Sequence, residues 1–176
     1  MVAHLGYISV KRHSEIGYIG GYLVVNSHAR PLEFYCTMPV KPSRAQQLLY
    51  GPTVDEFVCG EQIAKALTTK GKIKPNVLLV DSLATLAISH VCELPVLHME
   101  IGDSSESSLS IPSTTTLKHQ SLTVGQMSLK VLSSRSYVNE QSIAHLESMA
   151  EAFDLAEPFD RIREALLEAH PIARAA

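Results

Sequence analysis

Cysteine is scarce in this sequence, and the few thiols lie far apart. The 176 residues contain only Cys36, Cys59 and Cys92. An odd number of thiols at wide spacings argues against a disulfide framework. Each lies in an apolar stretch, which is typical of a buried structural thiol. We therefore expect reduced cysteines in a cytoplasmic protein.

The sequence also lacks targeting signals, membrane spans and an excess of positive charge. No basic N-terminal segment precedes an apolar core, so no signal peptide is predicted. No apolar run approaches the length of a membrane-spanning helix, and we expect no membrane partner. The net charge is −3, which excludes a global basic field around the molecule. A nucleic-acid role would therefore need a local basic patch.

Three short motifs of common enzyme sites are absent as well. The chain has no Walker-type Gly loop, no Gly-x-Ser-x-Gly elbow and no Cys-x-x-Cys. What it has is enough apolar material for a core, with 45% hydrophobic residues. The length fits one domain of ordinary size. We predict a single domain over residues 1–176.

Strand patterns dominate the first part of the chain. Three β-rich runs, able to form a meander, cover Leu5–Val10, Gly17–Asn26 and Leu32–Val40. A helical pattern follows at Val54–Lys70, with apolar residues at roughly helical spacing. The run Asn76–Val80 is apolar without alternation, as expected of a central strand that is covered on both faces.

The second part of the chain continues with shorter elements. We predict a helix at Leu83–Val91 and a strand at Pro95–Ile101. Residues 103–116 are rich in Ser and Thr, which predicts a flexible loop. Gln126–Leu132 is a candidate for one more strand. Residues 138–171 are predicted to form a pair of amphipathic helices, with stripes at Ile143, Leu146, Ala150 and Phe153 and at Phe159, Ile162, Leu166 and Ala169.

This order of elements resembles the RNase H-like fold, and within it the endonuclease V branch. The segments that carry the resemblance are Leu78–Ser82 and Leu86–Val96. In that family an apolar strand ends in Val-Asp, and a helix with a Ser/His-containing core leads to a Leu-Pro entry into the next strand. The resemblance implies an α/β fold with a mixed sheet, built as a three-strand meander followed by two helix–strand units, with C-terminal amphipathic helices.

The resemblance also implies where a metal site would lie. The family needs a group of carboxylates that hold Mg²⁺ for phosphodiester cleavage. Asp81 fills the position at the end of the central strand, and Asp55, Glu56 or Glu61 could supply the acid of the first helix. We expect Asp81 and Glu61 as the metal ligands. In the middle of the first strand only Ser9 is present, a poor replacement for a bridging carboxylate.

Each of these acids has a structural interpretation too. Asp81 is a good N-cap type and could cap the following helix. Asp55 and Glu56 could simply stabilise the start of a helix, because negative charges there interact favourably with the helix dipole. Glu61 lies in the middle of a predicted helix, where it is either solvated or facing the sheet.

One local basic cluster is visible in the sequence. Side chains that could contact phosphates are Lys41, Arg44, Lys70, Lys72 and Lys74, with Lys65 nearby in the chain. A helix C-terminus also favours lysine for its own dipole, so a solvated helix end is the alternative.

Three functions follow from these observations. The first, which we favour, is a non-catalytic RNase H-like binding or assembly subunit without a cofactor. Its partner would be another protein or a second copy, with nucleic acid as a further candidate. The second is an Mg²⁺-dependent endonuclease that resembles endonuclease V. The third is an unrelated α/β enzyme with a small-molecule pocket near Asp81 and Ser82.

Overall fold

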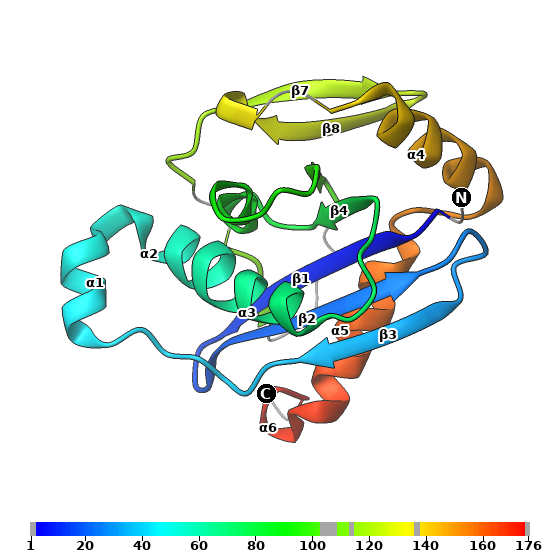
Figure 1. Ribbon diagram of the computed structural model, residues 1–176. Helices are drawn as coiled ribbons and strands as arrows, with labels where there is room; N and C mark the ends of the chain where they lie inside the picture. The colour runs from blue at the N-terminus through cyan, green and yellow to red at the C-terminus, as the bar shows by residue number, and fades with distance from the viewer. Residues whose placement is uncertain (1–2, 103–108, 113–114, 136–137, 175–176) are drawn as a thin grey trace.

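One mixed sheet runs through the computed structural model, which describes residues 3–102, 109–112, 115–135 and 138–174. Its strands are β1 (Leu5–His13), β2 (Gly17–Val25), β3 (Pro31–Cys36), β4 (Val77–Val80), β5 (Val96–Met99), β6 (Leu109–Ser110), β7 (His119–Val124) and β8 (Met127–Leu132). Their order is β3-β2-β1-β4-β5-β8-β7, and β6 pairs with β1 off this path (Figure 1).

The helical segments are shorter and more varied than the strands. They are α1 (Arg44–Tyr50), η1 (Gly51–Thr53), α2 (Val54–Glu56), η2 (Phe57–Ala64), α3 (Lys65–Lys70), η3 (Ala84–His90), η4 (Ser133–Arg135), α4 (Glu140–Ala152), α5 (Glu157–Ala169) and α6 (Pro171–Arg174).

The predicted mixed sheet is confirmed. Strands β1, β2 and β3 pair antiparallel as a meander. Strand β4 pairs parallel with β1, and β5 pairs parallel with β4. A helical segment precedes each of these two parallel strands. The parallel strands therefore all end at the same edge of the sheet, which is where polar side chains can converge.

The sheet is larger than the sequence suggested. Strand β1 extends beyond Val10 to His13, and β7 pairs with β8 as a hairpin on the far side of β5. The β7 sequence carries no clear apolar alternation, because most of this edge strand is exposed or half-buried. Of the loop predicted at 103–116, residues 103–108 and 113–114 lie outside the described residues, and Leu109–Ser110 forms β6.

The helix predicted over Val54–Lys70 is present as one continuous helical stretch made of α2, η2 and α3. Its middle part, η2, is a π-helix rather than an α-helix. Gly60 in this part packs against η3 so closely that a β-carbon would lie 2.6 Å from Cβ of Ala87 and 2.7 Å from N of Ile88. A π-helix often marks a functional site, and here it marks a tight contact between two helical segments.

The helix predicted at Leu83–Val91 is a 3₁₀-helix, η3. Its first turn is closed by bonds from Thr85 N to the Ser82 carbonyl and from Leu86 N to the Leu83 carbonyl, both 3.1 Å. The residues from Ala84 to Ser89 are all buried. A short connector enclosed on all sides favours this tighter winding.

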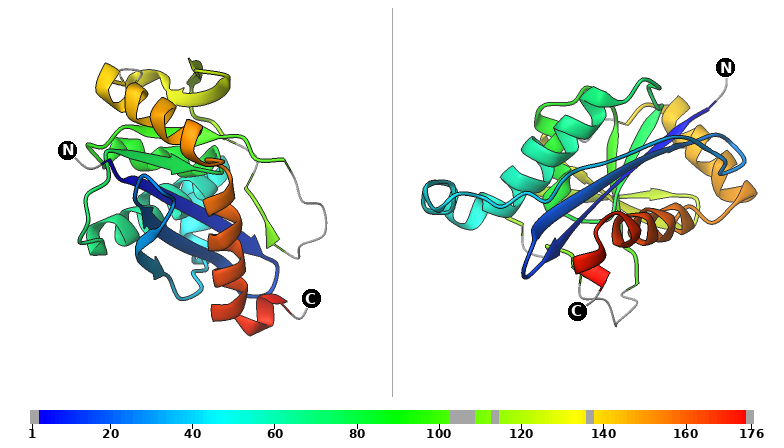
Figure 2. Two further views of the ribbon diagram at one scale, coloured as in Figure 1. Left: turned by 90° about the vertical axis from the view of Figure 1, so that its right-hand side faces the viewer. Right: turned by 90° about the horizontal axis from the view of Figure 1, so that it is seen from below.

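Two apolar cores lie on opposite faces of the sheet. One contains Leu5, Tyr7 and Leu79 and is covered by α4 and α5. The other contains Ile8, Leu78 and Val80 and is covered by η2, α3 and η3. Figure 2 shows α5 on one side of β1 and β2 and the α2–α3 stretch on the other. The alternation of side chains along β1 thus divides its residues between two cores.

The structure also tests the predictions about membrane spans and about the cysteines. No described helix is both long and apolar enough to span a membrane. The three cysteines are free thiols, but only Cys59 is buried; Cys36 lies exposed on the edge strand β3 and Cys92 is half-buried. The expectation of a buried thiol is therefore wrong for Cys36, because an edge strand leaves one face open.

Candidate functional site

Asp81 stands at the edge of the sheet where the parallel strands end. It follows β4 directly, and its side chain is almost completely buried. In the parallel pairing of β1 with β4, Ile8 lies opposite Val80. The next residues along, Ser9 and Asp81, therefore meet, and Ser9 Oγ donates a hydrogen bond of 2.7 Å to Asp81 Oδ2.

Lys11 reaches the same carboxylate oxygen. It lies two residues beyond Ser9 on the same face of β1, and its Nζ is 2.5 Å from Asp81 Oδ2. The two side chains are 7% and 1% exposed. A buried carboxylate of this kind requires a counter-charge, because removing an ion from water without one costs several kcal/mol. Lys11 supplies that charge.

Asp81 does not cap the helix that follows it. The cap position of η3 is Leu83, and no side chain bonds to the free backbone groups there. The Ser82 hydroxyl instead donates to the Pro112 carbonyl at 3.1 Å. The interpretation of Asp81 as an N-cap is therefore wrong, because its carboxylate is engaged by β1.

Glu56 is the second buried acid among the predicted site residues. It lies at the end of α2, and its carboxylate accepts hydrogen bonds from the Thr115 hydroxyl and from both the hydroxyl and the backbone N–H of Thr116. These residues precede β7, so Glu56 ties the first helical stretch to the chain that leads into the hairpin. Its oxygens are occupied by donors of the protein itself.

The other two predicted acids lie elsewhere. Asp55 accepts a hydrogen bond from the Tyr18 hydroxyl, and Arg12 Nη1 is 3.9 Å away. Burial raises the pKa of Tyr18, and the bond to Asp55 acts in the same direction. Glu61 is half-buried within η2. Asp55, Glu56 and Glu61 belong to the stretch that covers one face of the sheet, whereas Ser9 and Lys11 align with the core on the other face.

The donor set around Asp81 does not fit Mg²⁺. Magnesium takes hard oxygen ligands in near-octahedral geometry, but Asp81 Oδ2 already receives a hydroxyl and an ammonium. Within the described ranges, no three side chains among His, Cys, Asp and Glu are close enough to hold a metal ion. Asp81, Asp55, Glu56 and Glu61 are therefore not assembled into a metal centre in this structure.

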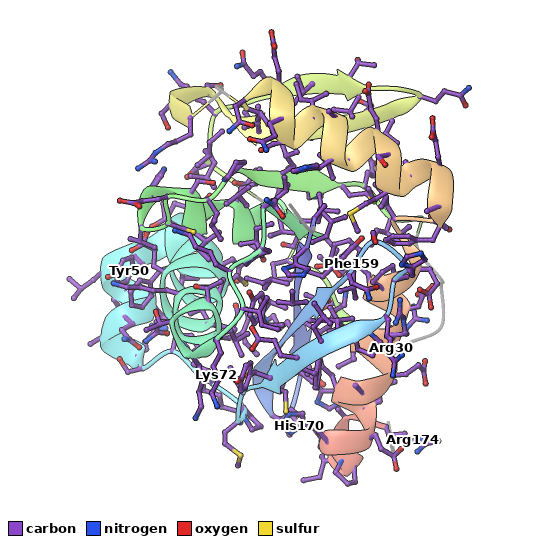
Figure 3. All side chains as sticks on the ribbon, turned by 45° about the vertical axis from the view of Figure 1, so that its right-hand side comes forward. Arg30, Tyr50, Lys72, Phe159, His170 and Arg174 are labelled. Carbon is purple, nitrogen blue, oxygen red and sulfur yellow. The ribbon has the colours of Figure 1, made fainter. Side chains whose placement is uncertain are left out.

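The predicted phosphate contacts are on the surface. Lys41, Arg44, Lys70, Lys72 and Lys74 are all exposed. Figure 3 shows Lys72 at the outside of the molecule. Its backbone N–H donates to Glu33 at 3.0 Å, so an acid lies next to part of this basic cluster. Of the tyrosines on the early strands, Tyr7, Tyr18 and Tyr22 are buried and serve the cores.

A cavity of about 530 Å³ opens beside Asp81. Its lining includes Lys11, Asp81 and Ser82, together with His98 from β5 and Phe159 from α5. The sequence placed a small-molecule pocket near Asp81 and Ser82, and a cavity is present there. Lys11 and His98 were missed. Lys11 could have been identified because it continues the alternation of Leu5, Tyr7 and Ser9, which places all four side chains on the same face of the strand.

His98 is neutral at pH 7. Burial lowers its pKa to about 4, and the nearby Lys130 ammonium acts in the same direction. Its Nδ1 atom and Asp81 Oδ1 are both buried and have no hydrogen-bond partner among the described residues. Such atoms are unusual in folded proteins and call for an explanation.

The strand order and directions define an RNase H-like α/β domain. The carboxyl edge of its parallel strands carries the Lys11–Asp81 ion pair and a cavity.

A comparison with known proteins finds that solved structures of endonuclease V are similar to this chain. No protein-family model matches the chain, and no curated protein does. A structure of human endonuclease V is 14% identical, with 99% of this chain and 87% of that chain covered and a TM-score of 0.47. A Ciona intestinalis endonuclease V variant, in complex with a 23mer DNA containing inosine followed by ribo-adenosine, is 11% identical, with coverages of 96% and 87% and a TM-score of 0.46. A likeness with sequence identities and TM-scores this low does not indicate the activity of this chain.

Proposed function

We propose that this chain is a non-catalytic RNase H-like domain that works as a binding or assembly subunit. The observation that carries the proposal is the Lys11 ammonium on Asp81, 2.5 Å from Oδ2 and buried with it. A divalent ion bound to this carboxylate would lie within a few ångström of a fixed positive charge. Like charges at that distance in a buried site repel strongly.

The position of Glu56 supports the same proposal. An acid on the first helix serves a metal centre only if its oxygens are free to bind the ion. The Glu56 carboxylate instead holds Thr115 and Thr116. Both buried acids thus have structural roles, and the proposed function needs no cofactor. Mg²⁺ belongs only to the alternative of an active endonuclease.

The partner is proposed from the surface. Leu48 and Leu49 of α1 are 66% and 85% exposed, and this helix buries none of its residues. Neighbouring exposed apolar side chains favour a protein partner or self-association. Nucleic acid is a further candidate, since the basic side chains named above are exposed and endonuclease V has been crystallised with DNA. Lys70 and Lys72 would then contact phosphates.

Metal binding and cleavage test the non-catalytic part. We expect no Mg²⁺- or Mn²⁺-dependent cleavage of labelled single- or double-stranded DNA or RNA. The double variant Ser9→Asp/Lys11→Ser places a second carboxylate beside Asp81 and removes the ammonium. We expect it to bind Mn²⁺ at least about tenfold more tightly than the natural sequence, measured by electron paramagnetic resonance. Cleavage that disappears in Asp81→Ala would overturn the proposal.

Solution measurements test the binding part. Light scattering reports self-association, and fluorescence anisotropy with labelled oligonucleotides reports nucleic-acid binding. If the partner is a second copy, we expect the double variant Leu48→Asp/Leu49→Asp to abolish self-association. If the partner is nucleic acid, we expect Lys70→Glu/Lys72→Glu to weaken oligonucleotide binding. A monomeric protein that binds no oligonucleotide and no other protein would contradict the binding or assembly role. The proposal that the domain is non-catalytic would not be affected by this result.

A further inference from the structure

Strand β3 forms one edge of the sheet, at the end of the meander (Figure 1), and its outer side is open. Just beyond the strand, Thr37 donates its backbone N–H to the Gly20 carbonyl of β2 at 2.9 Å. Because the backbone groups of successive strand residues point to opposite sides, the N–H and C=O groups of Phe34 and Cys36 point away from β2. Among the described residues, no other segment bonds to these groups.

The open edge lacks the usual protection against pairing with another chain. Edge strands are commonly protected by lysine, by proline or by a covering segment. Between Leu32 and Cys36 there is no lysine and no proline. The charged residue of this stretch is Glu33, and its carboxylate is occupied, because it accepts the backbone N–H groups of Lys72 and Ile73 at 3.0 and 3.1 Å. An added strand can therefore pair with β3.

One face of the open strand is apolar. Phe34 and Cys36 share this face. Phe34 is 38% exposed and Cys36 is exposed, as is Leu32 at the bulge that precedes them. Helix α5 lies on the same face, because a β-carbon on Gly21 of β2 would contact both Phe34 and Ile162 of α5. An apolar side chain of an added strand would extend this face and pack beside Phe34.

The opposite face of β3 is bordered by positive charge. Glu33 lies on this face and holds the segment that follows α3. Lys70, Lys72 and Lys74 alternate along that segment, and their side chains are exposed. None of the three forms an ion pair within the part of the chain that the structure describes. Acidic side chains of an added strand would complement these lysines.

We propose that the open edge of β3 binds an extended segment of a partner protein in which apolar and acidic side chains alternate. The apolar side chains lie beside Phe34, and the acidic ones face Lys70, Lys72 and Lys74. A second copy of β3 fits less well, because it would place a second group of lysines on the same face. The inference rests on the proposed binding or assembly role and gives it a surface and a partner chemistry.

The pairing we propose is antiparallel, which makes a specific prediction about the backbone of the partner. In an antiparallel pair, two residues that exchange both backbone hydrogen bonds lie opposite each other, with their side chains on the same face. Phe34 and Cys36 direct their backbone groups outwards, so the residues opposite them are the apolar ones. The N–H groups of the apolar residues therefore bond to β3, whereas those of the acidic residues face water.

Three fluorescein-labelled peptides test the side-chain pattern by fluorescence anisotropy with the full chain. The first contains Val-Glu-Ile-Glu-Val-Glu, and the second has the same composition in the order Val-Val-Ile-Glu-Glu-Glu. The third, Val-Lys-Ile-Lys-Val-Lys, keeps the alternation and reverses the charge. We expect the second and third to bind at least about tenfold more weakly than the first, because each loses one of the two complementary faces.

Backbone methylation distinguishes pairing with the strand edge from an apolar or ionic contact alone. Methyl groups on the nitrogens of Val and Ile in the first peptide remove the N–H groups that face β3. Methyl groups on the nitrogens of Glu project into water. We expect the first pattern to abolish binding and the second to weaken it by less than about threefold.

Variants of the chain test the same edge. Cys36→Pro removes one outward N–H, and a proline in this orientation is tolerated on an edge strand. Cys36→Ser is the matched control, because it keeps the N–H. We expect binding of the first peptide to fall at least about fivefold in Cys36→Pro and to be unchanged in Cys36→Ser, with equal circular dichroism spectra.

A second variant tests the charge without touching the strand. Lys72→Glu/Lys74→Glu changes exposed side chains only. It should weaken binding of the Val-Glu-Ile-Glu-Val-Glu peptide several-fold and strengthen binding of the Val-Lys-Ile-Lys-Val-Lys peptide. A loss of affinity for both peptides would contradict charge complementarity.

Other outcomes would overturn the proposal. They are equal affinities for the alternating and the rearranged peptide, equal effects of the two methylation patterns, or no binding of any peptide. A dimer of the natural sequence that Cys36→Pro separates would assign the edge to a second copy instead. Leu48→Asp/Leu49→Asp should leave peptide binding unchanged, so failure of the peptides together with association through α1 would overturn this inference and leave the proposed function standing.

Discussion

The Lys11 ammonium and the Asp81 carboxylate form an ion pair that is buried at the edge of the sheet. The pair is a poor source of net stability, because desolvation offsets much of the attraction. Its value lies in the dependence of each charge on the other. Either one alone would be an uncompensated charge among Ser9, Ser82 and the core.

This dependence can be measured with a double-mutant cycle. We expect Lys11→Met and Asp81→Asn each to lower the free energy of unfolding by roughly 3–5 kcal/mol, because each leaves one buried charge alone. The double variant should lose less than the sum of the two, by about 2–3 kcal/mol. Urea denaturation gives all four values. Strictly additive losses would show that the two charges do not stabilise each other.

His98 predicts a pH dependence of stability. Its pKa is lowered from 6.5 to about 4 in the folded chain, so the unfolded chain binds more protons between these values. Stability therefore falls as the pH falls from 6.5 towards 4, by roughly 3 kcal/mol from this group. His98→Phe should show a smaller loss of stability between pH 7 and pH 4.5 than the natural sequence. An equal loss in both would contradict a buried neutral imidazole.

Sequence patterns identified part of the residue-scale site. Asp81 was identified because an acid ends an apolar strand, whereas Ser9 was noted only as a poor replacement for a carboxylate in the first strand. Lys11 was missed because a lysine ordinarily ends a predicted strand, and only its pairing with a partner far along the chain permits its burial. His98 looked like an ordinary polar residue in a strand, because its burial results from tertiary packing that the neighbouring residues in the sequence do not indicate.

At the scale of elements, η2 and η3 pack tightly against each other at Gly60. Gly60 makes this contact possible, because any side chain there would meet Ala87 and the backbone of Ile88. The helical period of Val54–Lys70 predicted a helix, but no residue pattern distinguishes π winding from α winding. The π winding coincides with the close approach of Gly60 to η3, and the sequence order does not indicate this contact.

A single methyl group tests this contact. Gly60→Ala should lower the free energy of unfolding by roughly 1–3 kcal/mol through overpacking, although alanine is the better helix former. Gly102→Ala is the control, since a β-carbon there meets nothing within 4 Å; we expect a change within about 0.5 kcal/mol. Thermal and urea denaturation measure both. A stabilised Gly60→Ala variant would mean that η3 can move away at little cost.

At the scale of the whole molecule, the sequence predicted the meander and the two parallel strands well. These depend on local apolar runs that any packing would use. The coverage of both faces and a strand near Met127–Leu132 were predicted, but the pairing of β7 with β8 and the helices that cover each face were not. They depend on which face each helix covers, and on edge strands whose exposed residues leave little apolar signal.

The shared sheet makes the single domain over residues 1–176 a testable prediction. Both cores use alternate residues of the same strands, so neither should persist without the other. We expect one cooperative unfolding transition, with coincident midpoints by far-ultraviolet circular dichroism and by tyrosine fluorescence. Separate midpoints would divide the chain into independently folding parts.

The contact between Tyr7 and Phe159 has a consequence for the order of events during synthesis. One ring comes from the first strand and the other from α5, near the opposite end of the sequence. The meander and the η2 side can pair as soon as they leave the ribosome, but the α5 face of β1 and β2 stays uncovered until α5 follows. Such long-range closure slows folding and exposes apolar surface in the meantime. The nascent chain should therefore depend on chaperones until its last helices are made.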